Sequence, residues 1–113
     1  MRLNDIRVSP HFKLREFQCG CCKTVKLRPE LLAMLEELRR LRNSPIVITS
    51  GYRCPKHNRA VGGAAFSRHM NGAAADIYAP HAEQITLEAH ARAVGFAEII
   101  RGGKKNYLHV ACG

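Results

Sequence analysis

Apolar residues recur every three or four positions across residues 29–42, which is the spacing of one face of an α-helix. The apolar positions are Leu31, Met34, Leu35, Leu38 and Leu41. Pro29 suits the first helical turn, Glu30 suits the positive end of the helix dipole, and several arginines suit its negative end. We therefore predict a scaffold helix here. A second helix, with a weaker apolar face, is predicted over residues 83–94 and ends at Gly95.

Shorter apolar runs predict β-strands, beginning with a run rich in β-branched side chains after the first helix. The predicted strands are residues 46–50, 73–78, 96–101 and 107–111, with a hairpin turn over residues 102–106. Residues 1–18 predict an irregular lead-in, and residues 54–66 predict a glycine-rich loop. This order of elements predicts an α+β fold with a small, mostly antiparallel sheet packed with helices.

The length of 113 residues predicts a single domain, residues 1–113, with one modest core that a bound metal would help to stabilise. No run approaches the roughly 20 consecutive apolar residues that a membrane span needs. The first five residues, M-R-L-N-D, lack the apolar core of a signal peptide. We therefore expect a protein that is cytoplasmic as synthesised, and any export would need another route.

The formal net charge of +9 suggests either a polyanionic partner, such as nucleic acid or an acidic cell wall, or simple solubility. The basic residues are scattered, with one cluster formed by Arg101, Lys104 and Lys105. Aromatic residues are few and there is no Trp to stack on bases. We therefore do not expect a nucleic-acid partner.

Three of the five cysteines, Cys19, Cys21 and Cys22, fall within four residues. An odd number of cysteines, in a chain expected to be cytoplasmic, argues against a full disulfide framework. The clustered thiols have three possible states: a second metal site, a disulfide with Cys54, or reduced and idle thiols. The C-x-C-C spacing lacks the paired C-x2-C knuckles of a zinc ribbon, so the roles of all five, including Cys112, stay open.

The chemistry of the chain centres on His69 and Asp76, which are seven residues apart, and on His109 near the C-terminus. Asn71 and Gly72 break a helix between the first two, which favours a loop at His69 and a strand at Asp76. We hypothesise that the three side chains bind one zinc ion and leave a coordination position open for water. Two neutral imidazoles and one carboxylate leave a net charge of about +1, which still acidifies bound water. The alternative is a surface histidine and an aspartate that caps a helix or closes a turn.

Residues 67–76 read S-R-H-M-N-G-A-A-A-D and resemble the S-x-H-x-x-G-x-A-x-D signature of a family of zinc peptidases. Its members are D-Ala-D-Ala carboxypeptidases and L-alanyl-D-glutamate endopeptidases. The runs I-T-S-G-Y-R-C-P at residues 48–55 and H-N-R-A-V-G-G-A at residues 57–64 resemble the small, single-domain branch of that family. The run Y-L-H-V at residues 107–110 resembles its closing motif, in which hydrophobic residues flank a histidine ligand. The resemblance covers residues 9–110.

The resemblance implies the compact fold shared by D-Ala-D-Ala peptidases and the signalling domain of Hedgehog proteins, with Zn2+ on the three side chains named above. It implies that Arg53 holds a substrate carbonyl or carboxylate, whereas without the motif Arg53 reads as a surface residue in a solvated turn. Tyr52 and Ser67 become candidates for substrate binding, although Ser67 is equally typical of a turn serine bonded to nearby backbone. The run S-P-H-F-K-L-R-E-F resembles the family's opening, which packs against the domain, so we expect a structural role for His11.

The chain departs from the family where a general base is expected. Many members place Glu or Asp three residues before the last histidine ligand, where this chain has Asn106, and others place Asp two residues after it, where this chain has Ala111. An amide cannot act as a base. The nearby carboxylate in the last hairpin is Glu98, and we offer it as the catalytic candidate. If no carboxylate serves, turnover falls by orders of magnitude or the protein binds without cutting.

The implied function is a zinc metallopeptidase that hydrolyses peptide bonds in bacterial peptidoglycan stem peptides, as a D-Ala-D-Ala carboxypeptidase or an endolysin-type endopeptidase. We expect a monomer whose partner is the peptidoglycan peptide, in a phage or prophage lysis or tail module that reaches the wall by non-classical release. The second hypothesis is a catalytically weak or inactive, zinc-stabilised cell-wall-binding module on the same fold. The third, a basic nucleic-acid-binding protein, has only the net charge behind it.

Overall fold

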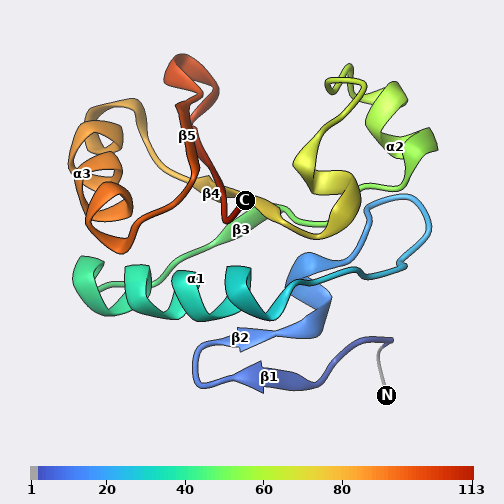
Figure 1. Ribbon diagram of the computed structural model, residues 1–113, viewed down its shortest axis with the longest axis horizontal. Helices are drawn as coiled ribbons and strands as arrows, with labels where there is room; N and C mark the ends of the chain where they lie inside the picture. The colour runs from blue at the N-terminus through green and yellow to red at the C-terminus, as the bar shows by residue number, and fades with distance from the viewer. Residues whose placement is uncertain (1–2) are drawn as a thin grey trace.

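Short β-strands form two separate antiparallel sheets in the computed structural model, which describes residues 3–113 (Figure 1). Together with three α-helices in the described chain, these sheets confirm the predicted α+β class. In chain order the elements are β1 (Arg7–Ser9), β2 (Phe12–Lys13), η1 (Leu14–Phe17), α1 (Pro29–Arg42), β3 (Ile48–Ser50), α2 (Pro55–Ala60), η2 (Arg68–Asn71), β4 (Ala74–Tyr78), η3 (His81–Glu83), α3 (Gln84–Val94), β5 (Glu98–Arg101), η4 (Gly103–Lys105) and β6 (Tyr107–Ala111), where η marks a 3-10 helix.

The larger sheet has the strand order β3-β4-β6-β5, and every neighbouring pair is antiparallel. β4 and β6 lie at its centre, and their register pairs Asp76 directly with His109. On the other side of β4, Ser50 pairs with Asp76, and at the far edge Glu98 pairs with Ala111. The sheet therefore brings side chains from distant parts of the sequence into one row.

The two faces of this sheet have different surroundings, because successive side chains of a strand point to opposite faces. One face joins the hydrophobic core, which also contains side chains of α1 and α3. The side chains that the sheet gives to the core are Ile48, Ala75, Ile77, Ile99, Leu108 and Val110. The alternate positions carry Asp76, Glu98 and His109 on the opposite face. The strands that build the core therefore also fix the polar row.

Helix α1 has the bounds that the apolar period predicts, and it runs along the sheet in Figure 1. Leu31, Leu35 and Leu38 are buried at helical spacing and pack in the core. Asn43 ends α1 in the left-handed conformation with φ 55°. Gly95 ends α3 in the same way, with φ 99°, as predicted. The four strands of the larger sheet have bounds within two residues of the predicted ranges.

The prediction of an irregular lead-in over residues 1–18 is wrong for the part that the structure describes. That segment forms the β1–β2 hairpin and then η1, and residues 1 and 2 lie outside the described residues. Glu36 of α1 fixes the hairpin, since its carboxylate accepts hydrogen bonds from Ser9 Oγ at 2.5 Å and from the His11 backbone at 2.8 Å. The His11 ring also lies 2.7 Å from Glu36, which is consistent with the expected structural role of His11.

The prediction of a loop over residues 54–66 is wrong for its first half, which contains helix α2. Pro55 occupies the first helical position, and the Cys54 sulfur accepts the backbone N–H of His57 at 3.4 Å. The sequence P-K-H-N-R-A has no apolar period, so its hydrophobic pattern carries no helix signal. α2 stands at the opposite end of the molecule from α3 (Figure 1).

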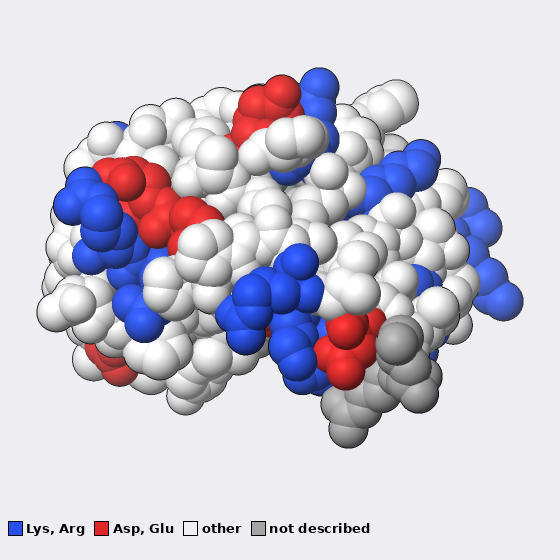
Figure 2. Space-filling model, turned by 90° about the horizontal axis from the view of Figure 1, so that it is seen from below, with Lys and Arg blue, Asp and Glu red and all other residues white. Residues whose placement is uncertain are grey.

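Charged side chains are dispersed over the face of the molecule that Figure 2 shows. Lys and Arg form several separate groups there, and Asp and Glu lie beside some of them. This view therefore contains no continuous basic track. No helix within residues 3–113 has the length and apolar character to cross a membrane.

Candidate metal centre

Three predicted ligand side chains converge on the polar face of the larger sheet. His69 comes from η2, Asp76 from β4 and His109 from β6, and each offers a donor atom within 4.8 Å of the others. His69 Nε2 lies 3.1 Å from Asp76 Oδ1, and His109 Nδ1 lies 2.9 Å from the same oxygen. The two imidazole rings are tilted by 57°, with centroids 5.1 Å apart. The alternative of a surface histidine is contradicted, because His69 is only 2% exposed.

A tight turn positions His69. The Ser67 hydroxyl oxygen accepts the backbone N–H of His69 at 3.2 Å and starts η2. Gly72 ends η2 with φ 74°, a conformation that favours glycine. A Cβ atom there would also lie 2.6 Å from the carbonyl carbon of Lys26, so the close approach of the two backbones excludes a side chain. The chain then enters β4, which carries Asp76 four residues later.

Hydrogen bonds select which nitrogen of His69 faces the centre. His69 Nδ1 lies 2.8 Å from the carbonyl oxygen of Gly51, an acceptor that has no proton to give. Nδ1–H therefore donates to Gly51, and Nε2 is the nitrogen that faces Asp76. This arrangement fixes the ring so that Nε2 is the nitrogen available to a metal ion.

His109 has the complementary orientation. Its Nε2 lies 2.6 Å from Glu98 Oε1, so Nε2–H donates to that carboxylate and Nδ1 faces Asp76. Glu98 reaches His109 from β5 because it lies diagonally across the strand pair, on the same face. Burial lowers the pKa of His109, but its hydrogen bonds to Asp76 and Glu98 outweigh that effect and raise the pKa.

Asp76 is the shared acceptor at the centre. Its Oδ1 faces both histidines, and its Oδ2 lies 3.2 Å from Arg53 Nη2. Burial raises the pKa of Asp76, but the hydrogen bonds from His109 and His69 prevail and lower it to about 2. Asp76 is therefore an ionised carboxylate at neutral pH.

Arg53 is held in place beside the centre by three side chains. Its Nε lies 3.1 Å from Ser50 Oγ, its Nη1 lies 3.4 Å from Asn58 Oδ1, and its Nη2 contacts Asp76. The Asn58 side chain is buried and donates in turn to the Ala64 carbonyl at 2.8 Å. The reading of Arg53 as a solvated surface residue is thus contradicted, since its side chain is only 15% exposed.

A pocket of about 270 Å³ opens over these side chains. Its lining residues come from the segment between β3 and α2, the loop after α2, η2 and the three strands β4, β5 and β6. They are Arg53, Ala64, Phe66, Ser67, Arg68, His69, Asp76, Glu98, Ile100, Tyr107 and His109. The pocket therefore combines the three convergent donors with cationic, acidic and apolar walls.

The matched region of the Peptidase M15 family model spans residues 10–111 of this chain. The chain belongs to the Peptidase M15 family. A zinc D-Ala-D-Ala carboxypeptidase from Streptomyces albus G is 37% identical to it over 101 residues, which cover 83% of this chain and 40% of that protein. The chain thus spans less than half the length of this relative. The family predicted from the sequence motifs is confirmed, and the observed α+β architecture is compatible with the Hedgehog/DD-peptidase fold.

The donor set of this Peptidase M15 chain fits a zinc ion. Zinc at a catalytic centre takes three protein ligands and keeps a fourth position for water, and nitrogen and carboxylate oxygen are among its usual ligand atoms. Here His69 Nε2, Asp76 Oδ1 and His109 Nδ1 face one another, and the second nitrogen of each histidine has its own acceptor. Such outer acceptors are what zinc-binding histidines generally have.

Glu98 has two partners in the pocket, and Arg68 is one that the sequence did not single out. Arg68 Nη1 lies 2.6 Å from Glu98 Oε2, while Glu98 Oε1 faces His109. The hydrogen bond to His109 is the largest cause that lowers the pKa of Glu98, and Arg68 acts in the same direction. Nothing in the motif marks Arg68, because only the fold brings it against β5.

Asn106 and Ala111, which occupy the usual base positions, are not among the residues that line the described pocket. Asn106 follows η4 with φ 59°, and its Oδ1 accepts the backbone N–H of His81 at 3.2 Å. Ala111 is fully buried opposite Glu98. Tyr52 is also buried and lies beneath the Lys26 ammonium group, which is 5.6 Å from its ring centroid. Ser67 does line the pocket, whereas the role predicted for Tyr52 has no such support.

Proposed function

We propose that this chain is a zinc metallopeptidase that hydrolyses peptide bonds in the stem peptides of bacterial peptidoglycan. The observation that carries the proposal is the convergence of His69, Asp76 and His109 in a pocket that Arg53 and Glu98 also line. Membership of the Peptidase M15 family supports the reaction class. The name of the relative, a zinc D-Ala-D-Ala carboxypeptidase, supports the metal and the substrate.

His69 Nε2, Asp76 Oδ1 and His109 Nδ1 would hold the zinc. When bound, zinc supplies Lewis acidity, which polarises a substrate carbonyl and lowers the pKa of a bound water toward neutrality. Gly51 and Glu98 keep the two imidazoles in the orientation that this ligand set requires, since each accepts the remaining N–H of one histidine. The protein would therefore supply side chains that are already oriented to bind the zinc.

Arg53 would bind the carbonyl oxygen or carboxylate of the substrate. A guanidinium group has five N–H donors in a fixed fork, and side-chain partners in the described residues hold three of them. The remaining donors suit a developing oxyanion or a terminal carboxylate. Ser50, Asn58 and Asp76 fix the plane of the guanidinium, so little reorganisation is needed when the substrate arrives.

Glu98 would take the proton from the attacking water and pass it to the leaving amine. Asp76 and Glu98 are the carboxylates among the described pocket residues, and Asp76 is already assigned as a ligand. The lowered pKa of Glu98 keeps it ionised, which a proton acceptor must be. Glu98 accepts one hydrogen bond from Arg68 through Oε2 and one from His109 through Oε1. Glu98 would therefore have to break one of these two hydrogen bonds in order to accept a proton.

The charges of the pocket and the relative's name support the proposed substrate class. Arg53 and Arg68 line a pocket in a chain of net charge +9, and stem peptides carry free carboxylates on an anionic wall polymer. A carboxypeptidase would place the terminal carboxylate against these arginines, whereas an endopeptidase would place an internal carbonyl there. The phage or prophage setting, the non-classical release and the monomeric state remain predictions from the sequence.

The test is to incubate the zinc-loaded protein with purified peptidoglycan and to measure newly freed amines and released D-alanine. The expected result is zinc-dependent release that Asp76→Ala abolishes. Release of D-alanine alone identifies a carboxypeptidase, and a new internal amine without D-alanine identifies an endopeptidase. No release above the Asp76→Ala background would refute the enzymatic proposal.

A wall-binding module without turnover is the second candidate, because Asn106 and Ala111 occupy the positions where the family usually has a base. Its expected signature is zinc-dependent co-sedimentation with peptidoglycan and no freed amine. Salt-sensitive DNA binding by metal-free protein would instead support the nucleic-acid hypothesis.

A further inference from the structure

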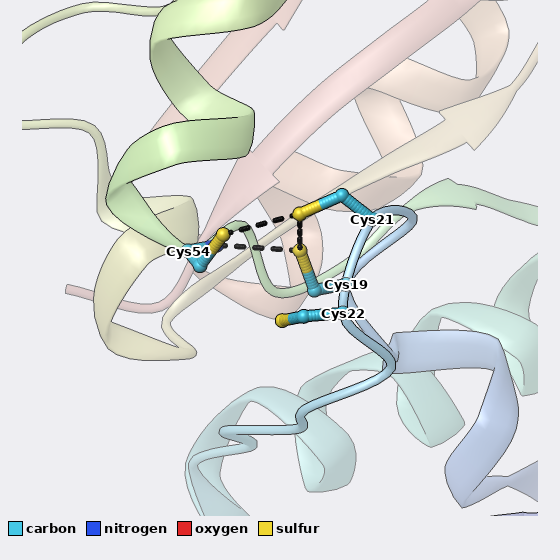
Figure 3. Close-up of side chains that lie close together, drawn as sticks. All are labelled: Cys19, Cys21, Cys22 and Cys54. Atoms are coloured by element: carbon cyan, nitrogen blue, oxygen red, sulfur yellow. Dashed lines mark hydrogen bonds between the residues drawn. The ribbon is translucent and has the colours of Figure 1, made fainter.

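Four cysteine sulfurs converge at a second place in the fold, outside the pocket described above. Cys19, Cys21 and Cys22 lie in the loop after η1, and Cys54 lies at the start of α2 (Figure 3). The sulfurs of Cys21 and Cys54 are 3.3 Å apart, and those of Cys19 and Cys21 are 3.6 Å apart. All four Sγ atoms lie within 4.8 Å of one another, although 33 residues separate Cys21 from Cys54.

The backbone around these sulfurs is arranged to donate hydrogen bonds to them. Cys19 Sγ accepts the backbone N–H of Cys54 at 3.4 Å. Cys54 Sγ accepts the backbone N–H of His57 at 3.4 Å. Hydrogen bonds of this kind stabilise a sulfur that carries negative charge, which is the form that binds a metal.

The loop that carries three of the cysteines is closed on itself. The Cys19 backbone N–H donates to the Thr24 carbonyl at 2.8 Å, and the Lys23 N–H donates to the Cys19 carbonyl at 3.0 Å. Lys23 adopts φ 64°, which turns the chain back on itself after Cys22. This turn presents the thiols on the side that faces Cys54, as Figure 3 shows.

We propose that Cys19, Cys21, Cys22 and Cys54 bind a structural zinc ion through four thiolates. Zinc bound tetrahedrally by thiolates at about 2.3 Å separates neighbouring sulfurs by about 3.8 Å, close to the observed spacings. A disulfide engages only two sulfurs at a time, whereas here all four approach one point. Closed four-thiolate sites of this kind are structural, because they leave no position for water or substrate.

The position of the cluster gives the bound metal a mechanical role. Cys54 directly follows Arg53, and the Tyr52 backbone N–H donates to the Phe17 carbonyl at 2.8 Å, two residues before Cys19. The metal would tie the segment after η1 to the start of α2, so that the backbone is anchored on both sides of Arg53. A domain of this size has a limited core, and such a crosslink adds folding free energy directly.

The experiment measures zinc per chain by elemental mass spectrometry after zinc loading and desalting. Two zinc ions are expected for the wild-type protein, one for Cys54→Ser, one for Cys22→Ser and one for Asp76→Ala. Cys112→Ser is the matched control, since this fifth cysteine lies outside the cluster, and it should retain two. One zinc ion in wild-type protein, unchanged by Cys54→Ser, would overturn the proposal.

A second measurement needs no cysteine variant. Cobalt-loaded wild-type and Asp76→Ala proteins should both show thiolate-to-cobalt charge-transfer absorption in the near ultraviolet, and chelation should expose four additional thiols to alkylation. Absence of that absorption, or an intact mass that shows paired oxidised cysteines in protein from a reducing cytoplasm, would refute the site. Failure of the histidine site alone would leave the absorption intact, so the two centres are tested separately.

Discussion

Glu98→Gln is the substitution that separates proton transfer from the positioning of His109. Glutamine has the same shape as glutamate, and its side-chain oxygen can still accept the His109 Nε2–H that Glu98 Oε1 accepts at 2.6 Å. The ion pair with Arg68 is lost, but both side chains are more than 30% exposed and such a pair contributes little to stability. Folding and zinc affinity should therefore be retained, while the ability to take a proton is lost.

The expected effect on catalysis is large. Positioned general bases contribute about 10²–10⁴-fold to rate, which corresponds to about 2.7–5.4 kcal/mol of transition-state free energy. We expect Glu98→Gln to lower kcat by this factor at saturating zinc, with KM little changed. Glu98→Ala should also weaken zinc binding by about 10–100-fold, because His109 loses the acceptor of its second nitrogen.

The assay is steady-state release of amine from a soluble stem peptide, with zinc affinity measured in parallel by chelator competition. Glu88→Gln is the matched control, since Glu88 pairs with Arg92 and Arg101 away from the pocket. It should leave kcat and zinc affinity unchanged. Wild-type turnover by zinc-saturated Glu98→Gln would refute the role of Glu98 as the base, and wild-type zinc affinity of Glu98→Ala would refute its role as a positioning partner.

Three further substitutions, one of them with a matched control, test other parts of the structure. Arg53→Lys should lower kcat/KM by about 10²-fold at saturating zinc, because one ammonium group cannot replace a guanidinium with three fixed contacts, and an unchanged value would remove Arg53 from the mechanism. Gly72→Ala should cost at least about 2 kcal/mol of unfolding free energy in urea, since strain at φ 74° adds to a clash with the Lys26 backbone. Gly62→Ala, with φ 72° and open space, should cost only about 1 kcal/mol, and equal losses would show that crowding is unimportant. Glu36→Gln should cost about 1–2 kcal/mol at neutral pH. Burial raises the pKa of Glu36 but hydrogen bonds to the first hairpin lower it overall, so this stability is present above the ordinary value of 4.5 and is lost as pH falls below it. Thermal unfolding across that range should show a weaker acid dependence in the variant than in the wild-type protein.

Elements with a strong apolar period could be predicted from the sequence alone. The bounds of α1 and β6 agree with the predictions, because their buried side chains recur at spacings of helix and strand. The β1–β2 hairpin and α2 could not be predicted in this way. Glu36, a residue of α1, holds the hairpin, and a sulfur cap at Cys54 together with the buried side chain of Asn58 holds α2. The contacts of Glu36 are tertiary and those of Cys54 and Asn58 are polar contacts within the segment, so the apolar pattern carries no signal of either.

The three donors of the candidate metal centre were predictable because two specific motifs, at residues 67–76 and 107–110, contain them, and the structure brings them together. Their outer partners were not predictable. The acceptor of His69 is a backbone carbonyl at Gly51, which no residue identity reveals, and Arg68 reaches Glu98 only through packing of η2 beside β5. The substrate-binding role predicted for Tyr52 has no support from the structure. Tyr52 is next to Arg53 in the sequence, but its side chain is buried and does not line the described pocket.

The location of Glu98 gives a physical reason why this chain can lack a carboxylate at positions 106 and 111. Asn106 adopts a left-handed conformation that asparagine tolerates better than glutamate, and its side chain is used to bind the His81 backbone. Ala111 lies directly opposite Glu98 on the same face of the sheet. A second carboxylate at position 111 would place like charges at cross-strand distance, which destabilises a sheet. The small side chain at position 111 therefore leaves the space and the charge balance that Glu98 requires, and Glu98 can reach His109 from the neighbouring strand.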